Sequence, residues 1–428
     1  MRLHTPLITV SIVAAYVGID VSHAQEVDYY SRDKYESVLD RKQPEFDPEP
    51  VRLGSLLVSS RAEASLSTTD NVFASETDEE SDLLLRVGAA ASAVSDWSNN
   101  QIGLDLSAYR NEYLDFSNES NDNLQAQLRG RLDVTRDFSF SGRAFVEDRA
   151  EQRTDLTGSI GVDRPVQLTR SGAAVRADYK NDRVQLNGGL TFISRDFDDA
   201  RSIVDGSNVD QDFRDREEVS VDARASYAIS PDVAIFAQAR SYDTSFDNQS
   251  LIGGVLRTRD NDGYTFQVGA NFELQTLISG DIAVGYLEEN KKDAAFGDVD
   301  GLSVEGNLNW YPSRLTTVTA NAGRRAADIG ILEAPSGTQT NFGVNVAHEF
   351  RRNVIGQVFF DQTQFETEDI DREDEINQFG LSATYKLNKR AHLQAYARYI
   401  DREISGLDNT GSSGYENTVA GIGISLFP

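Results

Sequence analysis

Apolar and polar residues alternate with a period of two in many separate stretches of the chain after Leu53. In the stretch 124–135, Leu, Ala, Leu, Gly, Leu and Val alternate with Gln, Gln, Arg, Arg, Asp and Thr. Similar alternation covers 219–229, 264–274, 379–387 and 391–399. A strand places successive side chains on opposite faces, whereas this pattern leaves no apolar stripe on a helix. The chain is therefore expected to be all-β, with one apolar face on each strand.

The breaks between these stretches are of two kinds, which alternate along the chain. Eight are short and rich in residues that suit hairpin turns: 95–100, 136–137, 181–182, 230–232, 275–276, 312–314, 351–353 and 388–390. Nine are long: 70–81, 115–122, 152–165, 198–212, 247–261, 290–302, 327–338, 366–376 and 403–415. These connections predict a transmembrane antiparallel β-barrel of about eighteen strands, with short periplasmic turns and long acidic extracellular loops.

The composition also favours a barrel. Apolar residues make up 39% of the chain and charged residues 26%, which is too polar for several soluble cores. The 16 Tyr and 21 Phe nevertheless argue against disorder. A barrel resolves the conflict because only one face of each strand must be apolar. A soluble β-rich surface protein is the alternative, and it would partition into buffer and not into detergent.

The first residues have the layout of a secretory signal peptide. Arg2 precedes an apolar stretch over 7–19, and small residues end at Ala24. We therefore predict a signal peptide over 1–24, a periplasmic N-terminal extension over 25–52 and an outer-membrane barrel over 53–428. The extension is polar, so a flexible tail and a contact with a periplasmic export partner both stay open. No run of 18 apolar residues follows the signal peptide.

Several kinds of chemistry are not expected. Cysteine is absent, which excludes disulfides and thiolate metal sites. The net charge of −28 repels phosphate backbones, so nucleic acid is not an expected partner. The sequence contains no nucleophile elbow, metal-binding His pair or phosphate loop, so we expect no enzyme, catalytic residue, cofactor or metal site. The acidic loops are interpreted as solvated charge, with Ca²⁺ bridging to lipopolysaccharide phosphates as the alternative.

If the apolar faces meet lipid, the opposite faces point into the lumen. Charged residues predicted to line it are Asp105, Arg129, Arg131, Arg143, Arg170, Arg176, Asp222, Arg224, Arg240, Glu305 and Arg398. Opposing Arg and carboxylate rows would favour hydrated, hydroxyl-rich or charged solutes. Simple pairing between neighbouring strands is the alternative interpretation.

Aromatic residues recur just before the short turns. They are expected to form an interface girdle at the periplasmic rim, and they are Trp97, Tyr179, Tyr227, Phe272, Trp310, Phe350 and Tyr385.

Residues 43–48, QPEFDP, followed by VRLG at 51–54, resemble the start of the first strand in the putative β-barrel porin 2 family. Further matches lie at 69–74, 95–97, 131–138 and 315–319, and the resemblance covers roughly 40–428. It implies an outer-membrane protein often found beside exopolysaccharide machinery and thought in some members to conduct the polymer. The chain departs from the usual barrel ending because Pro428 is last, with Phe427 beside it.

The expected function is a channel for export of exopolysaccharide or passage of polar solutes. A plugged structural or adhesive barrel that binds cations, lipopolysaccharide or a surface partner through its loops is the alternative. Expected partners are outer-membrane lipid, lipopolysaccharide and the barrel assembly machinery. A periplasmic polysaccharide-export complex is a further hypothesis.

Overall fold

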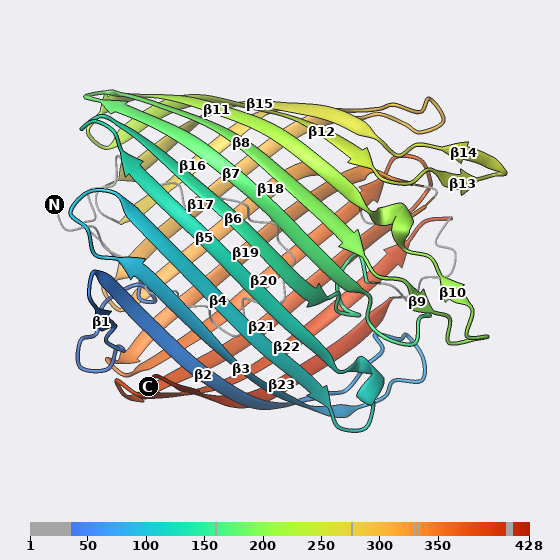
Figure 1. Ribbon diagram of the computed structural model, residues 1–428, viewed down its shortest axis with the longest axis horizontal. Coiled ribbons are helices and arrows are strands. Elements are labelled where there is room, and N and C mark those ends of the chain that lie inside the picture. The colour runs from blue at the N-terminus through green and yellow to red at the C-terminus, as the bar shows by residue number, and fades with distance from the viewer. Residues whose placement is uncertain (1–35, 159–160, 275–276, 329, 333, 408–413) are drawn as a thin grey trace.

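The computed structural model describes residues 36–158, 161–274, 277–328, 330–332, 334–407 and 414–428. Among these residues, nineteen strands form one antiparallel sheet, and β1 (Val51–Leu53) is only a short arm hydrogen-bonded to the start of β2. The other eighteen close into a barrel, because β2 pairs with β23 from Ala62 opposite Leu426 to Thr69 opposite Val419 (Figure 1). The predicted eighteen-strand barrel is confirmed.

The barrel strands follow one another around the ring in chain order. They are β2 (Leu56–Thr69), β3 (Asp82–Ser95), β4 (Gln101–Tyr113), β5 (Asn121–Asp133), β6 (Phe138–Ala150), β7 (Gln167–Asn181), β8 (Val184–Phe197), β11 (Arg216–Ser230), β12 (Val233–Phe246), β15 (Asn261–Leu274), β16 (Ile278–Lys291), β17 (Val299–Ser313), β18 (Thr316–Ala327), β19 (Gly337–Arg351), β20 (Val354–Thr367), β21 (Glu373–Asn388), β22 (Ala391–Ser405) and β23 (Tyr415–Leu426). Each pairs with its predecessor in an up-and-down meander.

The two rims differ as the sequence predicts. Seven of the eight predicted short turns fall between consecutive described strands, and 275–276 lies outside the described residues. The short turns share one end with β1 and the C-terminus, at the left of Figure 1. The opposite end carries the small elements of the long loops: η2 (Ser117–Glu119), β9 (Ala200–Arg201), β10 (Asn208–Val209), η3 (Asp212–Arg214), β13 (Ser250–Ile252) and β14 (Val255–Arg257). In the described part of the chain, no helix is long and apolar enough to cross a membrane.

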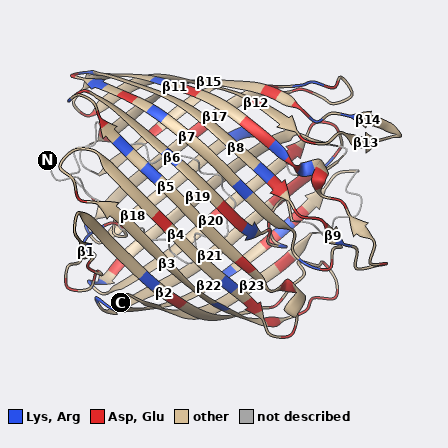
Figure 2. Cartoon of the chain, viewed as in Figure 1, with Lys and Arg blue, Asp and Glu red and all other residues tan. Residues whose placement is uncertain are grey.

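The outer face of the barrel is apolar. On β5, Leu124, Leu128 and Leu132 are 49–52% exposed, and Gln127 and Arg129 occupy the alternate positions. Exposed Val, Leu, Ile and aromatic side chains recur in the same alternation on the other strands. Such a surface is stable against lipid and not against water. Charged residues interrupt the strands at intervals and gather in the loops at the end opposite the short turns (Figure 2).

Replacing Leu128 by Arg is expected to destabilise the folded barrel by about 2–4 kcal/mol, because a guanidinium near mid-membrane loses its hydration. The free energy of unfolding, from guanidinium titration of the barrel in lipid vesicles, checks this. Gln127→Arg places the same group on the inner face and is expected to have little effect. Equal losses in the two variants would contradict the assignment of the faces.

Candidate channel and its two mouths

A cavity of about 1330 Å³ occupies the barrel interior. At the short-turn end its lining includes Lys42, Pro48 and Glu49, and at the loop end it includes Asp155 and Asp328. Between them it is lined by residues of β2 to β8 and β11 on one side and of β18 to β21 on the other. Charged and amide side chains therefore stand among apolar ones along the interior, from one mouth to the other.

Two pairs of the predicted lumen residues lie together on the inner wall. Asp105 pairs with Arg129 at 3.0 Å, and Arg176 pairs with Asp222 at 3.3 Å. Glycines make room for both pairs: a Cβ on Gly103 would lie 2.6 Å from Arg129 Nε, and one on Gly189 would lie 2.4 Å from Asp222 Oδ1.

The remaining predicted lumen residues also lie at inward positions, away from the exposed apolar residues of their strands. Ion pairs join Arg131 to Asp133 (2.8 Å), Arg240 to Glu218 (2.7 Å) and Arg170 to Glu147 (3.9 Å). Gln238 forms hydrogen bonds with both Arg224 (3.3 Å) and Glu305 (3.1 Å). Arg143 lies over the Phe145 ring, and Arg398 lines a smaller pocket. Of the eleven residues, Asp105, Arg129 and Arg170 line the large cavity. Whether any of them guides a solute stays a prediction.

The predicted aromatic girdle lies at the short-turn end. Trp97, Tyr179, Tyr227, Trp310, Phe350 and Tyr385 are 36–68% exposed, and Phe272 is half-buried. Their contact with the membrane interface stays a prediction.

At the loop end, the loop between β6 and β7 folds across the mouth. Arg214 forms two hydrogen bonds with Glu151, at 2.6 and 2.9 Å, and both side chains are at most 3% exposed. Further along, Tyr415 donates to the Thr154 carbonyl at 2.9 Å and Arg402 donates to the Leu156 carbonyl at 3.3 Å. This one loop is thereby tied both to η3, just before β11, and to β22 and β23 on another part of the ring.

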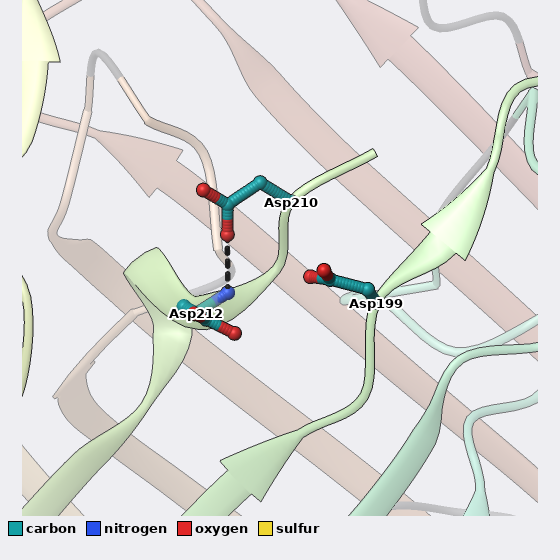
Figure 3. Close-up of side chains that lie close together, drawn as sticks. All are labelled: Asp199, Asp210 and Asp212. Atoms are coloured by element: carbon teal, nitrogen blue, oxygen red, sulfur yellow. Dashed lines mark hydrogen bonds between the residues drawn. The ribbon is translucent and has the colours of Figure 1, made fainter. Parts of the chain in front are cut away.

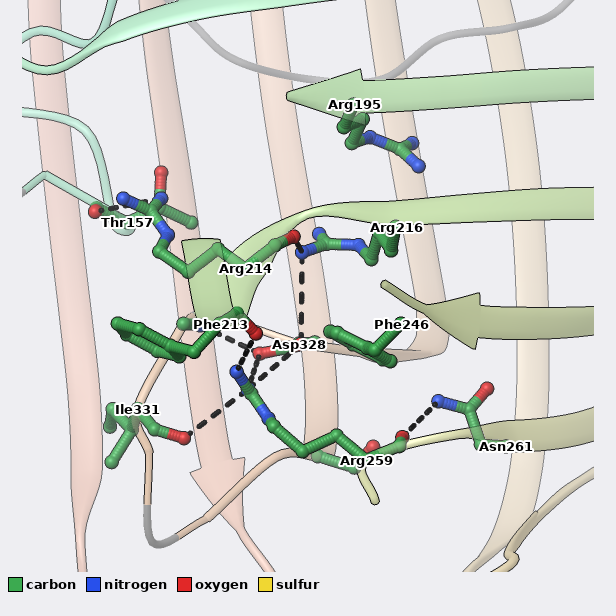
Figure 4. A network of polar contacts seen from close by, with 12 residues as sticks. Thr157, Arg195, Phe213, Arg214, Arg216, Phe246, Arg259, Asn261, Asp328 and Ile331 are labelled. Atoms are coloured by element: carbon green, nitrogen blue, oxygen red, sulfur yellow. Dashed lines mark hydrogen bonds and ion pairs between the residues drawn. The ribbon is translucent and has the colours of Figure 1, made fainter. Parts of the chain in front are cut away.

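The loop after β18 reaches inward to meet the same region (Figure 4). Arg259 is fully buried and pairs with Asp328 at 3.1 Å, and it also donates to the carbonyls of Phe213 and Ile331. Burial alone would raise the pKa of Asp328, but Arg259 and Arg216 more than offset this and hold it below its ordinary value. Arg259 and the ionised carboxylate together therefore fasten three loop segments.

The sequence did not single out Glu151, Arg214, Arg259 or Asp328. Their loops are rich in charge, and a charged loop is ordinarily a solvated one. The sequence did contain one signal of such pairs. Arg residues are interspersed among the loop carboxylates, and a buried carboxylate needs a cation as its partner.

The short-turn mouth is narrowed by residues 36–50, which precede β1. Val38 is buried against Ala347 and Ile355, and its N–H donates to Thr317 Oγ1 at 3.0 Å. Arg41 pairs with Glu349 at 3.0 Å. Lys386 pairs with Asp47 at 2.6 Å. This part of the N-terminal extension is bound to the inner wall and is not a free tail.

An acidic cluster stands apart from the cavity. Asp199, Asp210 and Asp212 are exposed, and one carboxylate oxygen from each lies within 4.8 Å of the others (Figure 3). Asn208 and the Gln211 N–H donate to Asp199 and lower its pKa, and the Asp212 N–H donates to Asp210. These bonds organise the loop between β8 and β11.

The family model described as putative beta-barrel porin 2 matches residues 43–426. Similar solved structures include the copper transporter OprC, with 10% identity, a TM-score of 0.47, and 89% of this chain and 82% of that chain covered. OpdK of Pseudomonas aeruginosa with vanillate has 11% identity, a TM-score of 0.44, and coverage of 87% and 99%. OccAB3 of Acinetobacter baumannii has 12% identity, a TM-score of 0.45, and coverage of 87% and 99%. No curated protein matches the chain.

Replacing Glu151 by Gln is expected to release the loop between β6 and β7, because it leaves the buried Arg214 cation without its carboxylate. Removing one partner of a buried pair costs about 3–5 kcal/mol. Trypsin cleavage within 152–165 on intact cells should therefore accelerate. Glu112→Gln breaks the exposed Arg110–Glu112 pair and should change cleavage little. Unchanged cleavage of this loop in E151Q would contradict the proposal that the Arg214–Glu151 pair holds it in place.

The pH dependence of the loop before β11 provides a second test. Burial raises the pKa of Asp215 to about 6, against the hydrogen bond it accepts from the Phe197 N–H and with help from nearby carboxylates. The ordinary pKa of an Asp carboxyl is 3.8, so between pH 3.8 and 6 the folded loop binds more protons than the unfolded loop. The stability of the folded loop should therefore rise as the pH falls from 6 towards 4.

Hydrogen exchange of 198–215, corrected for the intrinsic pH effect, measures that stability. The difference in loop stability between the wild type and the Asp215→Asn variant should grow as the pH rises above 4. A pH-independent difference would contradict the shifted pKa.

Proposed function

Since the chain belongs to the putative beta-barrel porin 2 family, we propose that this outer-membrane β-barrel passes polar solutes through its interior. The observation that supports this most is the cavity between the two mouths, which has many charged side chains on its wall. Interiors of barrels of this size hold water unless something fills them. Charged and amide side chains on the wall replace part of the hydration shell of a passing solute.

The restricted mouths support a narrower form of the proposal. The buried pairs of Arg214 with Glu151 and of Arg259 with Asp328 hold loops across one end, and Val38 and Arg41 fasten a segment across the other. We propose a selective, restricted pore and not a wide diffusion pore. The same contacts favour the second candidate, a plugged structural or adhesive barrel, which would pass no ions.

Export of exopolysaccharide is the finer form of the proposal. The family resemblance supports it. Deleting the gene and measuring secreted polysaccharide tests it, with the intact chain supplied in trans as the control. Normal secretion by the deletion strain would remove this form and leave passage of smaller polar solutes.

The route to the membrane belongs to the proposal as well. We propose export by a signal peptide cleaved after Ala24, which lies outside the described residues, and insertion by the barrel assembly machinery. Lipopolysaccharide would surround the loop end, where many carboxylates gather (Figure 2). A periplasmic polysaccharide-export complex would meet the opposite mouth.

The refolded full-length chain is expected to give stable single-channel steps in a planar bilayer, after a gel-mobility shift on boiling establishes that it is folded. Val38→Asp combined with Arg41→Ala should raise the conductance, because it frees the segment that narrows the short-turn mouth. Arg352→Ala breaks only the exposed pair with Glu45 and should leave conductance unchanged. A folded but silent barrel, in all three forms, would support the plugged alternative.

A further inference from the structure

Asp361 on β20 is a carboxylate of the inner wall that no group of the described protein neutralises. Phe360, the residue before it, is 37% exposed on the outer face, so Asp361 points into the barrel. Its side chain is half-buried, and within the described part of the chain it makes neither an ion pair nor a hydrogen bond. Removing a carboxylate from bulk water is costly unless a positive charge or hydrogen-bond donors replace that water. The position therefore calls for a positively charged ligand.

Among the described residues, the side chains around Asp361 carry no positive charge. Gly343 on β19 and Gln378 on β21 are directly opposite it. The other inward neighbours, two residues along each of the three strands, are Phe359, Thr363, Asn341, Asn345, Ile376 and Gly380. The nearest inward arginines by register lie on β22, two strands away. The carboxylate is thus surrounded by neutral amide, hydroxyl and hydrocarbon groups.

The missing side chain of Gly343 opens a space between Asp361 and Asn321. Asn321 on β18 is directly opposite Gly343, on the side away from Asp361. A Cβ on Gly343 would lie 2.4 Å from Asp361 Oδ1 and 2.5 Å from Asn321 Oδ1, which is too close for a real side chain. A carboxylate oxygen and an amide oxygen from different strands therefore converge on one point above this glycine.

Further oxygen atoms beside Asp361 have no donor. Gln378 Oε1 and Asn345 Oδ1 are buried and accept no hydrogen bond from the described residues. Gln378 also lines the cavity, as does Thr363, the next inward residue of β20. Carboxylate and amide oxygens are the ligands that hard cations take, and in a pore they replace the water that such an ion loses. The group offers acceptors and one negative charge, which suits a cation and repels an anion.

We propose that Asp361, Asn321 and Gln378 form a binding site for one monovalent cation, sodium or potassium, on the inner wall. The single carboxylate balances a single positive charge, whereas calcium sites gain affinity from several carboxylates. The inference rests on the proposed channel for its role in passage, where the site favours cations along this wall. Binding itself does not require conduction.

The conduction test is the reversal potential of the folded full-length barrel in a planar bilayer under a KCl gradient. Asp361→Asn keeps the size of the side chain and removes its charge. It is expected to lower the potassium-to-chloride permeability ratio about threefold, the effect of one charge about 6 Å from an ion in water. Asp122→Asn removes the same charge from an exposed pair outside the cavity and should leave the ratio unchanged. An unchanged ratio in D361N overturns the role in passage.

The binding test uses thallium(I), which substitutes for potassium and scatters X-rays anomalously. Crystals of the folded barrel soaked in thallium(I) acetate are expected to show an anomalous peak beside the oxygens of Asp361 and Gln378. The peak should disappear in D361N and stay in D122N. Gly343→Ala keeps the charge but fills the space between Asp361 and Asn321, so the peak should disappear there too. A peak that persists in G343A overturns the part assigned to Asn321.

Together the two tests separate this inference from the channel proposal. A silent barrel that shows the peak, with the peak lost in D361N, overturns the channel and supports the site. A conducting barrel without the peak, or with the same peak in D361N, overturns the site and leaves the channel. A silent barrel without the peak overturns both.

Discussion

The structure depends on one constraint: within the bilayer, no water is present to bond the N–H and C=O groups of the backbone. Each unpaired group would cost several kcal/mol, so an open sheet edge is not tolerated there. The seam between β2 and β23 removes the last edge by pairing Ala62 to Thr69 with Leu426 to Val419. Closure then gives every strand two different surroundings, lipid outside and an enclosed polar space inside.

The enclosed side cannot be filled as an ordinary hydrophobic core, and the charged chemistry of the interior follows from this. Its buried apolar clusters are small in the described structure and lie near the rims, as with Val38, Ala347 and Ile355 at the short turns. Ion pairs, such as the one between Arg214 and Glu151, hold the loops in place instead.

Much of the barrel could be predicted because its signals are local. Leu128 faces outward and Arg129 inward because adjacent residues of a strand point to opposite faces. The turn at 181–182 follows from Asn and Asp, and Asp182 has a φ of 45°. The loop contacts could not be predicted in this way. Glu151 and Arg214 are 63 residues apart, and no periodicity relates them.

The sequence by itself determined the strand number, the facing of each side chain and the two kinds of connection, because each is set within a few residues. Only the tertiary structure decided how the mouths are restricted and which charges meet. Arg402 reaches Asp155 across 247 residues of sequence, and Arg195 meets Arg170 and Arg216, only because ring closure and strand register bring them together. Those contacts depend on geometry around the ring, which alternation along a strand does not encode.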